Sequence, residues 1–374
     1  MENSLNNNSN NGLNNSQMGG ERGSSNDATK SVSVVPNFEH VMQLNTFGNP
    51  NNIIEYYLGR WRHARTSAHM VKQQRELLVA YPEPRDRLRN ELQSCQRLGT
   101  TPDGKKIYLY DYRFNSSVMR ELGRLRALTF KVVGEGTKQQ RDIDAFDKIY
   151  RHIVLWDDQA QEIVGAYRIG EAFNYHQNTS ASMLYTERLF NYRPKFKSLF
   201  GQSIELGRSF IQPKYWSKRG LDYLWLGIGA YLTQHPNVRY MFGAVSISNE
   251  FPALAQQQIV ACYKHFFQPS DYQKLATPKM PFKVDRGTLE SFQGQSFAEA
   301  LLTLKQSLKH QNVTLPTLYK HYADLCDEGG IAFIDFNIDP DFSYCVDGLM
   351  LVDLKYIKDK KRRRYLDVHA QATQ

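Results

Sequence analysis

SIELGRSFI, residues 203–211, has the β-branched and apolar content of a buried strand. It nevertheless contains Glu205 and Arg208, and charges are costly to bury unless they are paired or hydrogen-bonded. Because side chains alternate along a strand, these two residues should point to opposite faces of a sheet. They converge only if a β-bulge interrupts the strand. We predict a bulge at Leu206–Gly207, since glycine is where a bulge forms most easily.

The composition of the whole chain is that of a folded protein with one large domain or two small ones. Its 374 residues are 41% hydrophobic and 12% aromatic, which is enough for a substantial core. The four cysteines are far apart and form no C-x-x-C pair, which argues against a zinc site or disulfides and fits a reducing compartment. No signal peptide and no apolar run of about 18 residues is present, so we expect a cytoplasmic protein.

The positive charge of the chain is concentrated near its C-terminus. Residues 355–365, KYIKDKKRRRY, carry a net charge of +6 out of a total of +9. This distribution favours a docking element over a basic domain and argues against nucleic acid as a partner. We expect the segment to bind anionic lipid at roughly 1 kcal/mol per basic residue, peripherally at the inner face of the cytoplasmic membrane. A solvated tail is the alternative.

Composition also divides the chain into segments. We predict a disordered Asn-rich tail over 1–50, a helical extension over 51–105, a folded domain over 106–355 and a basic tail over 356–374.

Within the folded domain, strand and helix patterns alternate. The predicted strands are 107–114, the hairpin 152–158 and 162–170, then 203–211, 238–247, 331–338 and 347–354. The predicted helices are 119–130, capped by 115–117, then one within 212–235, 251–267 and 315–326, with a variable insertion at 268–313. This order predicts an α/β (α+β) fold with a mixed, mostly antiparallel sheet flanked by helices.

Four motifs occur in an order that resembles a known family. They are Leu125-Arg126 with Phe130, DIDAFD at 142–147 with His152, VGAYR at 164–168, and ELGRS at 205–209. Over roughly 107–355 the chain resembles the ornithine/glycine-lipid N-acyltransferases (hemolysin-like), whose core is similar to that of acyl-homoserine-lactone synthases. The resemblance implies a GNAT fold and transfer of a long acyl chain from acyl carrier protein, or from acyl-CoA, to the amine of an amino acid.

The charged residues then acquire expected roles. An acceptor ammonium must lose a proton before it attacks, and Glu205 is the expected base. Arg208, Asp144 and Asp147 complete the expected catalytic set, and the bulge would offer a backbone N–H to the oxyanion. A structural ion pair of Glu205 with Arg208 or Arg168, and turn or helix-start roles for the aspartates, are the alternatives. At the acceptor end we expect Arg126, Phe130, Arg168 and His152, and no metal is expected.

The loop that precedes the 212–235 helix occupies the place of the GNAT pyrophosphate loop, where backbone N–H groups bind phosphate. Of the pattern R/Q-x-x-G-x-G/A only Gly220 matches, because Ser217 and Asp222 replace the expected residues. A negative side chain there favours a carrier-protein donor with a single phosphodiester over a tightly held coenzyme A. An ordinary basic loop is the alternative. The residues expected to contact the acidic carrier protein are Lys214, Lys218, Arg219 and Gly220.

Other readings remain open at this point. Phe130, Trp156 and Tyr215–Trp216 are expected to hold the acyl chain, and Tyr263 either protonates the leaving thiolate or packs in the core. The protein could instead be an acyl-homoserine-lactone-synthase-like enzyme, which product mass spectrometry would reveal. A non-catalytic acyl-binding protein is the third reading, supported by the degraded phosphate loop.

Overall fold

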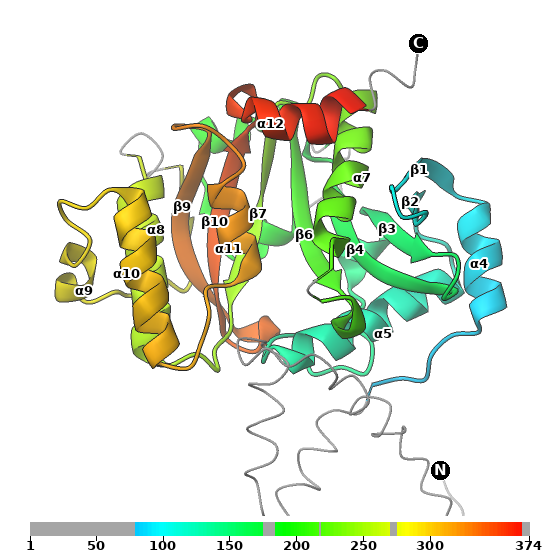
Figure 1. The fold of residues 1–374 in the computed structure, drawn as a ribbon, viewed down its shortest axis with the longest axis horizontal. Helices are drawn as coiled ribbons and strands as arrows, with labels where there is room; N and C mark the ends of the chain where they lie inside the picture. The colour runs from blue at the N-terminus through cyan, green and yellow to red at the C-terminus, as the bar shows by residue number, and fades with distance from the viewer. Residues whose placement is uncertain (1–78, 175–183, 217, 270–274, 369–374) are drawn as a thin grey trace, which may run out of the picture. The chain divides into compact units, whose positions relative to one another are not determined.

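The computed structural model describes residues 79–174, 184–216, 218–269 and 275–368. The tail predicted for 1–50, and the part of the extension before residue 79, lie outside these residues. An eight-stranded sheet forms the centre of the fold (Figure 1). In spatial order its strands are β1 (Gln96–Thr100), β2 (Lys106–Tyr110), β3 (Arg151–Asp157), β4 (Glu162–Gly170), β6 (Ser203–Ile211), β7 (Tyr240–Ile247), β10 (Cys345–Asp353) and β9 (Ile331–Asp339).

Neighbouring strands in this sheet are antiparallel, apart from the parallel pair β6 and β7. A second sheet of two short strands consists of β5 (Phe190–Tyr192) and β8 (Ala276–Pro278). The mixed, mostly antiparallel α/β fold expected from the sequence is confirmed.

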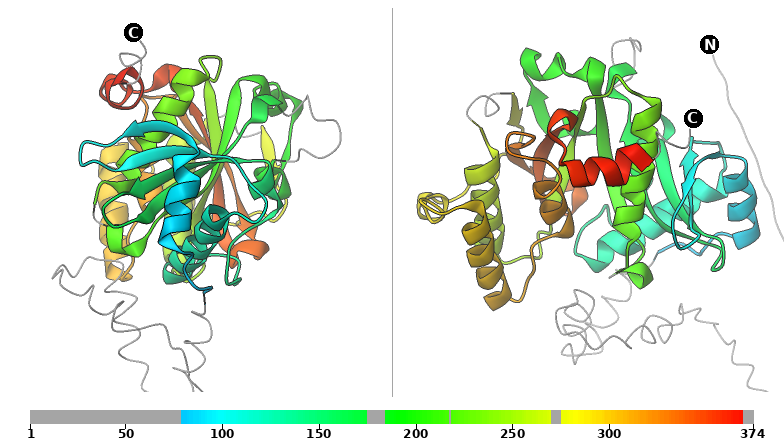
Figure 2. Two further views of the ribbon diagram at one scale, coloured as in Figure 1. Left: turned by 90° about the vertical axis from the view of Figure 1, so that its right-hand side faces the viewer. Right: turned by 45° about the horizontal axis from the view of Figure 1, so that its top comes forward.

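Helices cover both faces of the large sheet (Figure 2). One face packs against α7 (Gly220–Gln234), α8 (Ala253–Phe267), α10 (Phe297–His310) and α11 (Thr317–Ala323). The other face packs against α4 (Arg85–Gln93) and α5 (Ser117–Val132), and we call it the α5 face. The predicted N-cap of α5 is confirmed, because the Ser116 hydroxyl accepts a hydrogen bond from the Met119 N–H at 3.0 Å. The shorter helices are α6 (Pro194–Lys197), α9 (Arg286–Glu290) and α12 (Asp359–Arg362).

The start of the folded domain lies earlier than the sequence indicated. Residues 96–100 were assigned to a helical extension, but they form the edge strand β1, which pairs with β2. Helix α4 buries Leu88 and Leu92 against the same cluster as α5. The strand was missed because an edge strand of this length buries little: Leu98 is its one fully buried residue.

The basic C-terminal segment is folded as far as residue 368, which corrects the expectation of a separate tail. Helix α12 continues into a π-helical turn, Arg363–Asp367, that packs on α7 with Tyr365 buried. A Cβ at Gly229 of α7 would collide with the Tyr365 carbonyl oxygen, so glycine is needed for this close approach. Two of the lysines, Lys358 and Lys361, pair with Asp324 at 3.0 and 2.8 Å.

Strands β6 and β7 separate in the middle of the sheet (Figure 1). They pair only where Ser203–Glu205 lies beside Tyr240–Phe242. Beyond this point Gly207–Ser209 on β6, and Ala244 and Ser246 on β7, are partly exposed. We call this unpaired stretch of the two strands, with its partly exposed residues, the β6–β7 slot.

Candidate active site

A β-bulge in β6 begins the site. Against β4, Gly207 lies opposite Arg168 and Phe210 lies opposite Ala166, which leaves two β6 residues for one β4 residue between them. The extra residue is Arg208, whose φ of 47° is in the left-handed region. The predicted bulge is therefore confirmed, but it lies at Arg208–Ser209 and not at Leu206–Gly207.

The bulge brings the two charges of β6 to one face. The extra residue shifts the alternation of side chains along β6 by one position. The Arg208 side chain therefore lies on the α5 face, as the Glu205 side chain does. The conformational freedom of glycine does not cause the bulge, because Gly207 has no positive φ and a Cβ there would meet nothing within 4 Å. The unusual backbone is at Arg208 itself, and contacts of its side chain must stabilise it.

Asp147 is the centre of a buried charge cluster on the α5 face. Its Oδ1 lies 2.7 Å from Arg126 Nη1, 3.2 Å from Arg168 Nη1 and 3.1 Å from His152 Nε2. Burial alone would raise the pKa of Asp147, but Arg126, His152 and Arg168 together hold that pKa well below its ordinary value. Asp147 is therefore an ionised carboxylate that neutralises buried arginines, which is a poor state for a proton acceptor.

Asp144 connects the arginines of two strands. Its Oδ1 accepts from Arg168 Nη1 at 2.7 Å, and its Oδ2 lies 3.5 Å from Arg208 Nη2. The same carboxylate caps the 3-10 helix Ala145–Lys148, where Asp144 and Asp147 form a capping box. The helix-start role and the role in the charged cluster, which the sequence left as alternatives, are both present.

Arg208 is enclosed by aromatic rings and a further acid. Its guanidinium lies 4.8 Å from the ring centre of Tyr185 and 4.7 Å from that of Phe342. Its Nε is 3.0 Å from an Asp142 oxygen. Phe130 packs edge-on to Phe342 at 5.2 Å, so this predicted acceptor-end residue supports the cluster indirectly. Burial lowers the pKa of Arg208, but Asp142, Tyr185 and Asp144 together more than offset this and hold that pKa well above its ordinary value.

Glu205 is on the correct face but is fully engaged. Its carboxylate is 1% exposed and accepts hydrogen bonds from the Tyr150 hydroxyl, the Tyr185 N–H at 3.0 Å and the Thr186 N–H at 2.8 Å and hydroxyl at 2.5 Å. Within the described residues no ion pair joins it to Arg208 or Arg168, so that structural alternative is wrong. Burial raises the pKa of Glu205. The base role of Glu205 stays a prediction, and its visible task is to anchor the 3-10 helix Tyr185–Arg188.

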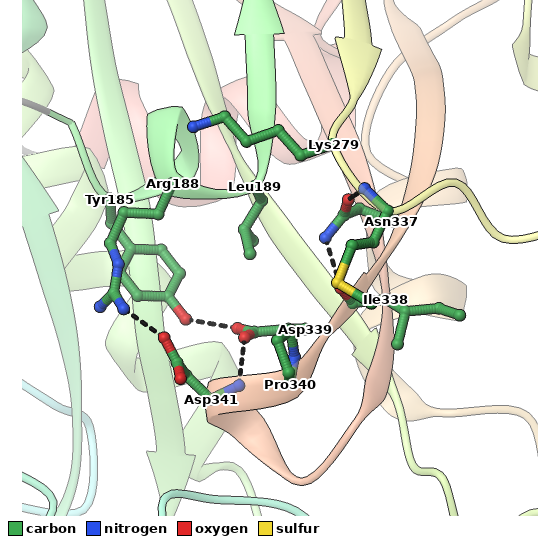
Figure 3. A pocket seen from close by; sticks show the side chains of 10 residues that line it. Tyr185, Arg188, Leu189, Lys279, Asn337, Ile338, Asp339, Pro340 and Asp341 are labelled. Atoms are coloured by element: carbon green, nitrogen blue, oxygen red, sulfur yellow. Dashed lines mark hydrogen bonds and ion pairs between the residues drawn. The ribbon is translucent and has the colours of Figure 1, made fainter.

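A pocket of about 250 Å³ opens beside the cluster (Figure 3). Tyr185 is common to both, because its ring covers Arg208 while its hydroxyl donates to Asp339 at 2.9 Å. The cationic side chains of Arg188 and Lys279 also line the pocket, and Arg188 pairs with Asp341. The remaining lining residues are Leu189, Met280, Asn337, Ile338, Pro340 and Asp341.

Two acids at the site were not predicted. Asp347 is 1% exposed, and its Oδ1 has no hydrogen-bond partner among the described residues. Burial, together with Asp339, raises the pKa of Asp347 to about 7. Glu135 is partly exposed, and burial together with Asp347 raises its pKa to about 8. The available signal was the GEGT sequence at 134–137, where glycines with positive φ flank the glutamate.

The expected donor residues lie away from the cluster, at the N-terminal end of α7. Lys214 pairs with Glu162, Lys218 lies 5.2 Å from the Tyr215 ring, and Arg219 lies 3.1 Å from Asp222. Gly220 is the first residue of α7, and Ser217 lies outside the described residues. These roles stay predictions.

The expected acyl-chain lining is wrong as a set. Phe130 and Trp156 belong to the cluster on the α5 face, whereas Tyr215 belongs to the cluster on the opposite face. Residues on opposite faces of a sheet do not line one channel. Tyr263 is completely buried and packs on Tyr319 and Phe333 at ring distances of 4.8 and 5.0 Å, which favours its packing role.

Comparison with known proteins agrees with this geometry. Residues 125–226 match the acetyltransferase (GNAT) domain family. The chain is 32% identical over 265 residues to a glycine N(alpha)-acyltransferase of Phocaeicola vulgatus, covering 66% of this chain and 80% of that protein. It is 31% identical over 264 residues to the protein of the same name from Bacteroides thetaiotaomicron, covering 66% and 77%. An L-ornithine N(alpha)-acyltransferase of Brucella abortus is 36% identical over 126 residues, covering 31% of this chain and 42% of that protein.

No solved structure was found that matches the chain. The residues that match the GNAT family, 125–226, include the bulged strand β6 and the charge cluster from Arg126 to Arg208. The chain belongs to the GNAT-fold ornithine/glycine N-acyltransferase family, and it is an acyltransferase.

Proposed function

We propose that this enzyme transfers a long acyl chain from an acyl-carrier-protein thioester to the amine of a small amino acid, with glycine as the first candidate. The product would be an N-acyl amino acid, a lyso-aminolipid. The observation that carries the proposal is the β6–β7 slot, which opens directly beside the bulge and the buried charge cluster. The names of the two longest-matching relatives support glycine as the acceptor.

The bulge suits the stabilisation of an oxyanion. Beyond Glu205 the β7-facing edge of β6 has no strand pairing with β7, so backbone N–H groups there are available to a bound thioester. A thioester carbonyl placed in the slot would receive such a donor as its oxygen becomes negative, which lowers the barrier to the tetrahedral intermediate. Because the donor is backbone, no side chain of the charge cluster needs to move.

The N-terminal end of α7 supports a carrier-protein donor over coenzyme A. Asp222, in the first turn of α7, is bound by Arg364 and accepts from the Tyr365 hydroxyl at 3.0 Å. This carboxylate and the C-terminal segment occupy the region where a helix N-terminus would otherwise attract a pyrophosphate. The phosphopantetheine arm of a carrier protein has a single phosphodiester, so it needs fewer phosphate-binding groups at this end of α7. Lys218 and Arg219 lie at this end and would contact an acidic partner, with Arg219 also 3.1 Å from Asp222.

The membrane contact also remains a proposal, now restricted to fewer residues. Of the basic segment, Lys355, Lys360 and Arg363 are exposed, whereas Arg364 is engaged with Asp222. No helix of the described residues is long and apolar enough to cross a bilayer. We propose that the exposed cations on and beside α12 bind anionic headgroups, which would bring the lipid product close to its destination.

Product analysis tests the proposed function. The purified full chain is incubated with palmitoyl-acyl carrier protein or palmitoyl-CoA and with glycine, ornithine or no acceptor, and the products are identified by mass spectrometry. We expect N-palmitoylglycine and faster turnover with the carrier protein. A homoserine-lactone product would identify the signal-synthase alternative, and acyl binding without turnover would identify the non-catalytic one.

A further inference from the structure

Asp347 lies between the β6–β7 slot and the pocket of Figure 3. In the sheet it is directly opposite Ser246 of β7 on one side and Asn337 of β9 on the other. Directly opposed residues share a face, and adjacent strands are about 4.8 Å apart. Ser246 is partly exposed at the slot, and Asn337 lines the pocket. Asp347 therefore lies in the sheet between a residue of β9 that lines the pocket and a residue of β7 that is partly exposed at the slot.

The loop that carries Glu135 is hydrogen-bonded to residues next to both β7 and β10, the strands of Ser246 and Asp347. The Ser248 hydroxyl, just after β7, donates to the Gly134 carbonyl at 3.1 Å. The Ser343 hydroxyl, just before β10, donates to the Gly136 carbonyl at 2.7 Å. The loop is thus fixed beside both β7 and β10, and Asp347 is close enough to raise the pKa of Glu135.

Glu135 and Asp347 differ from the aspartates of the charge cluster, because within the described residues no ion pair joins either of them to a cation. Asp142, Asp144 and Asp147 each lie within 3.5 Å of an arginine nitrogen. Asp347 keeps one buried oxygen without a partner among the described residues, whereas Glu135 is partly exposed. A buried carboxyl oxygen without a partner is costly unless a ligand completes it. The unpartnered Asp347 oxygen needs a hydrogen-bond donor, and a positively charged donor would be attracted by both carboxyl groups.

We propose that Glu135 and Asp347 form the subsite that receives the ammonium group of the acceptor amino acid and removes its proton. This inference rests on the proposed function, because it concerns the acceptor of that same reaction. The pocket would admit the amino acid with its carboxylate toward Arg188 and Lys279, which line it together with Asp339. The amine would then point toward Asp347.

The proton transfers balance as follows. The ammonium gives one proton to the carboxylate of Glu135, an N–H bond breaking as an O–H bond forms. The free amine adds to the thioester carbonyl carbon and forms the C–N bond. The nitrogen then releases its second proton to solvent. When the intermediate collapses the C–S bond breaks, and the thiolate takes the proton from Glu135. The products are an amide, a thiol and one proton in solution, and the carboxylate is restored.

The elevated pKa values agree with this task. A base works best when its pKa is near the working pH, and Glu135 and Asp347 have pKa values of about 8 and about 7. Burial is the main cause for both. The titratable or charged groups that influence this pair are Arg208 of β6, Asp339 of β9, Cys345 of β10 and Tyr319 of α11.

The test compares Glu135→Gln and Asp347→Asn with the wild-type enzyme in the same N-acylation assay, over pH 6 to 10. The matched control is Glu328→Gln, which makes the same change at an exposed position before β9. For the wild type we expect kcat/KM to rise through about pH 8. For Glu135→Gln we expect a loss of about 10²- to 10⁴-fold at neutral pH that shrinks as the acceptor amine deprotonates by itself. For Asp347→Asn we expect a rise in the acceptor KM with the thioester KM unchanged.

The outcomes separate the two proposals. If the wild type forms no N-acyl product with any donor and acceptor, the proposed function is wrong. If the wild type is active and Glu135→Gln keeps both its rate and its pH profile, the ammonium subsite is wrong while the function stands. A loss of equal size at all pH values would assign Glu135 a structural role and would also overturn the proposal. Circular dichroism of each variant excludes misfolding.

Discussion

Arg208 connects the sheet to the charge cluster. It supplies the extra residue of the bulge, and its side chain reaches Asp142 and the rings of Tyr185 and Phe342. A non-glycine residue in the left-handed region costs of order 1 kcal/mol, and these contacts offset that cost. The position of the bulge is therefore fixed by the side chain of Arg208 and not by the freedom of Gly207.

Asp147 should be essential for stability. The change Asp147→Asn leaves Arg126 and Arg168 buried with less compensating charge, and breaking a buried pair in this way costs about 3–5 kcal/mol. Urea unfolding followed by circular dichroism measures this cost. Asp341→Asn is the control, because Asp341 is 67% exposed and its pair with Arg188 should be worth less than about 1 kcal/mol. Equal losses in both variants would contradict the central role of Asp147.

Glu135 should cost the enzyme stability at the pH where it works. Its pKa is raised in the folded state to about 8 from an ordinary value of 4.5, so between these values the folded state binds more protons than the unfolded state. The contribution of Glu135 is then present below pH 4.5 and is lost as pH rises toward 8. We expect Glu135→Gln to have a higher Tm than the wild type at pH 8 and a similar Tm at pH 4.5, measured by differential scanning calorimetry. A lower Tm for the variant at pH 8 would show that Glu135 is ionised and stabilised in the folded protein.

At the scale of elements, the main feature is the separation of strand β6 from strand β7. A parallel pair can hold together along its whole length, yet this one ends after Glu205 and Phe242. Gly243 follows immediately, and a Cβ there would collide with the Leu206 carbonyl oxygen. The strands are thus closest at the point where they begin to diverge, and the slot opens beyond it.

Substitutions at two glycines should distinguish an effect on the packing of β6 and β7 from an effect on the access of the thioester to the slot. Gly243→Ala should destabilise the protein by about 1–3 kcal/mol, because the methyl group forces the strands apart where they are in contact. Gly207→Ala places its methyl group where nothing lies within 4 Å and should leave stability within about 0.5 kcal/mol. Because that space adjoins the slot, Gly207→Ala should instead raise the KM for the thioester. Thermal unfolding and steady-state kinetics measure the two effects, and an unchanged KM would place the thioester elsewhere.

At the scale of the whole molecule, the two ends of the described chain are joined to the same body as the sheet. The edge strand β1 extends the sheet on one side, and the segment after β10 crosses α7. Asp222 and Arg364 are far apart in sequence, but their ion pair fixes the first turn of α7 to this segment. The C-terminal residues therefore lie at the N-terminal end of α7, where the carrier protein is proposed to bind.

The exposed cations of this segment should determine membrane binding. We expect the double variant Lys360→Glu, Arg363→Glu to bind vesicles of anionic phosphatidylglycerol more weakly than the wild type, by about 1 kcal/mol or more for each residue. Co-sedimentation at low and physiological salt measures this. The control is Arg286→Glu, an exposed arginine on α9 that makes only a surface pair with Glu290. Equal binding by wild type and double variant would place the membrane contact elsewhere or remove it.

The sequence by itself determined the order of the central strands and helices, though not β1, β5, β8 or α10, and it determined the members of the charge cluster. Periodicity and capping act over a few residues, so β6, the β3–β4 hairpin and the Ser116 cap could be predicted from local pattern. The family resemblance supplied Arg126, Asp144, Asp147 and Arg168 as a set, but it did not say what each would contact.

Only the tertiary structure decided how that set is used. Glu205 could not be predicted to bind Thr186 and Tyr150, and Asp347 could not be predicted to lie between the slot and the pocket, since both depend on neighbours in other strands and loops. The docking of Tyr365 on Gly229 likewise needs the assembled helix α7. Burial and charge pairing are set by contacts between residues distant in the chain, and such contacts leave no local pattern in the sequence.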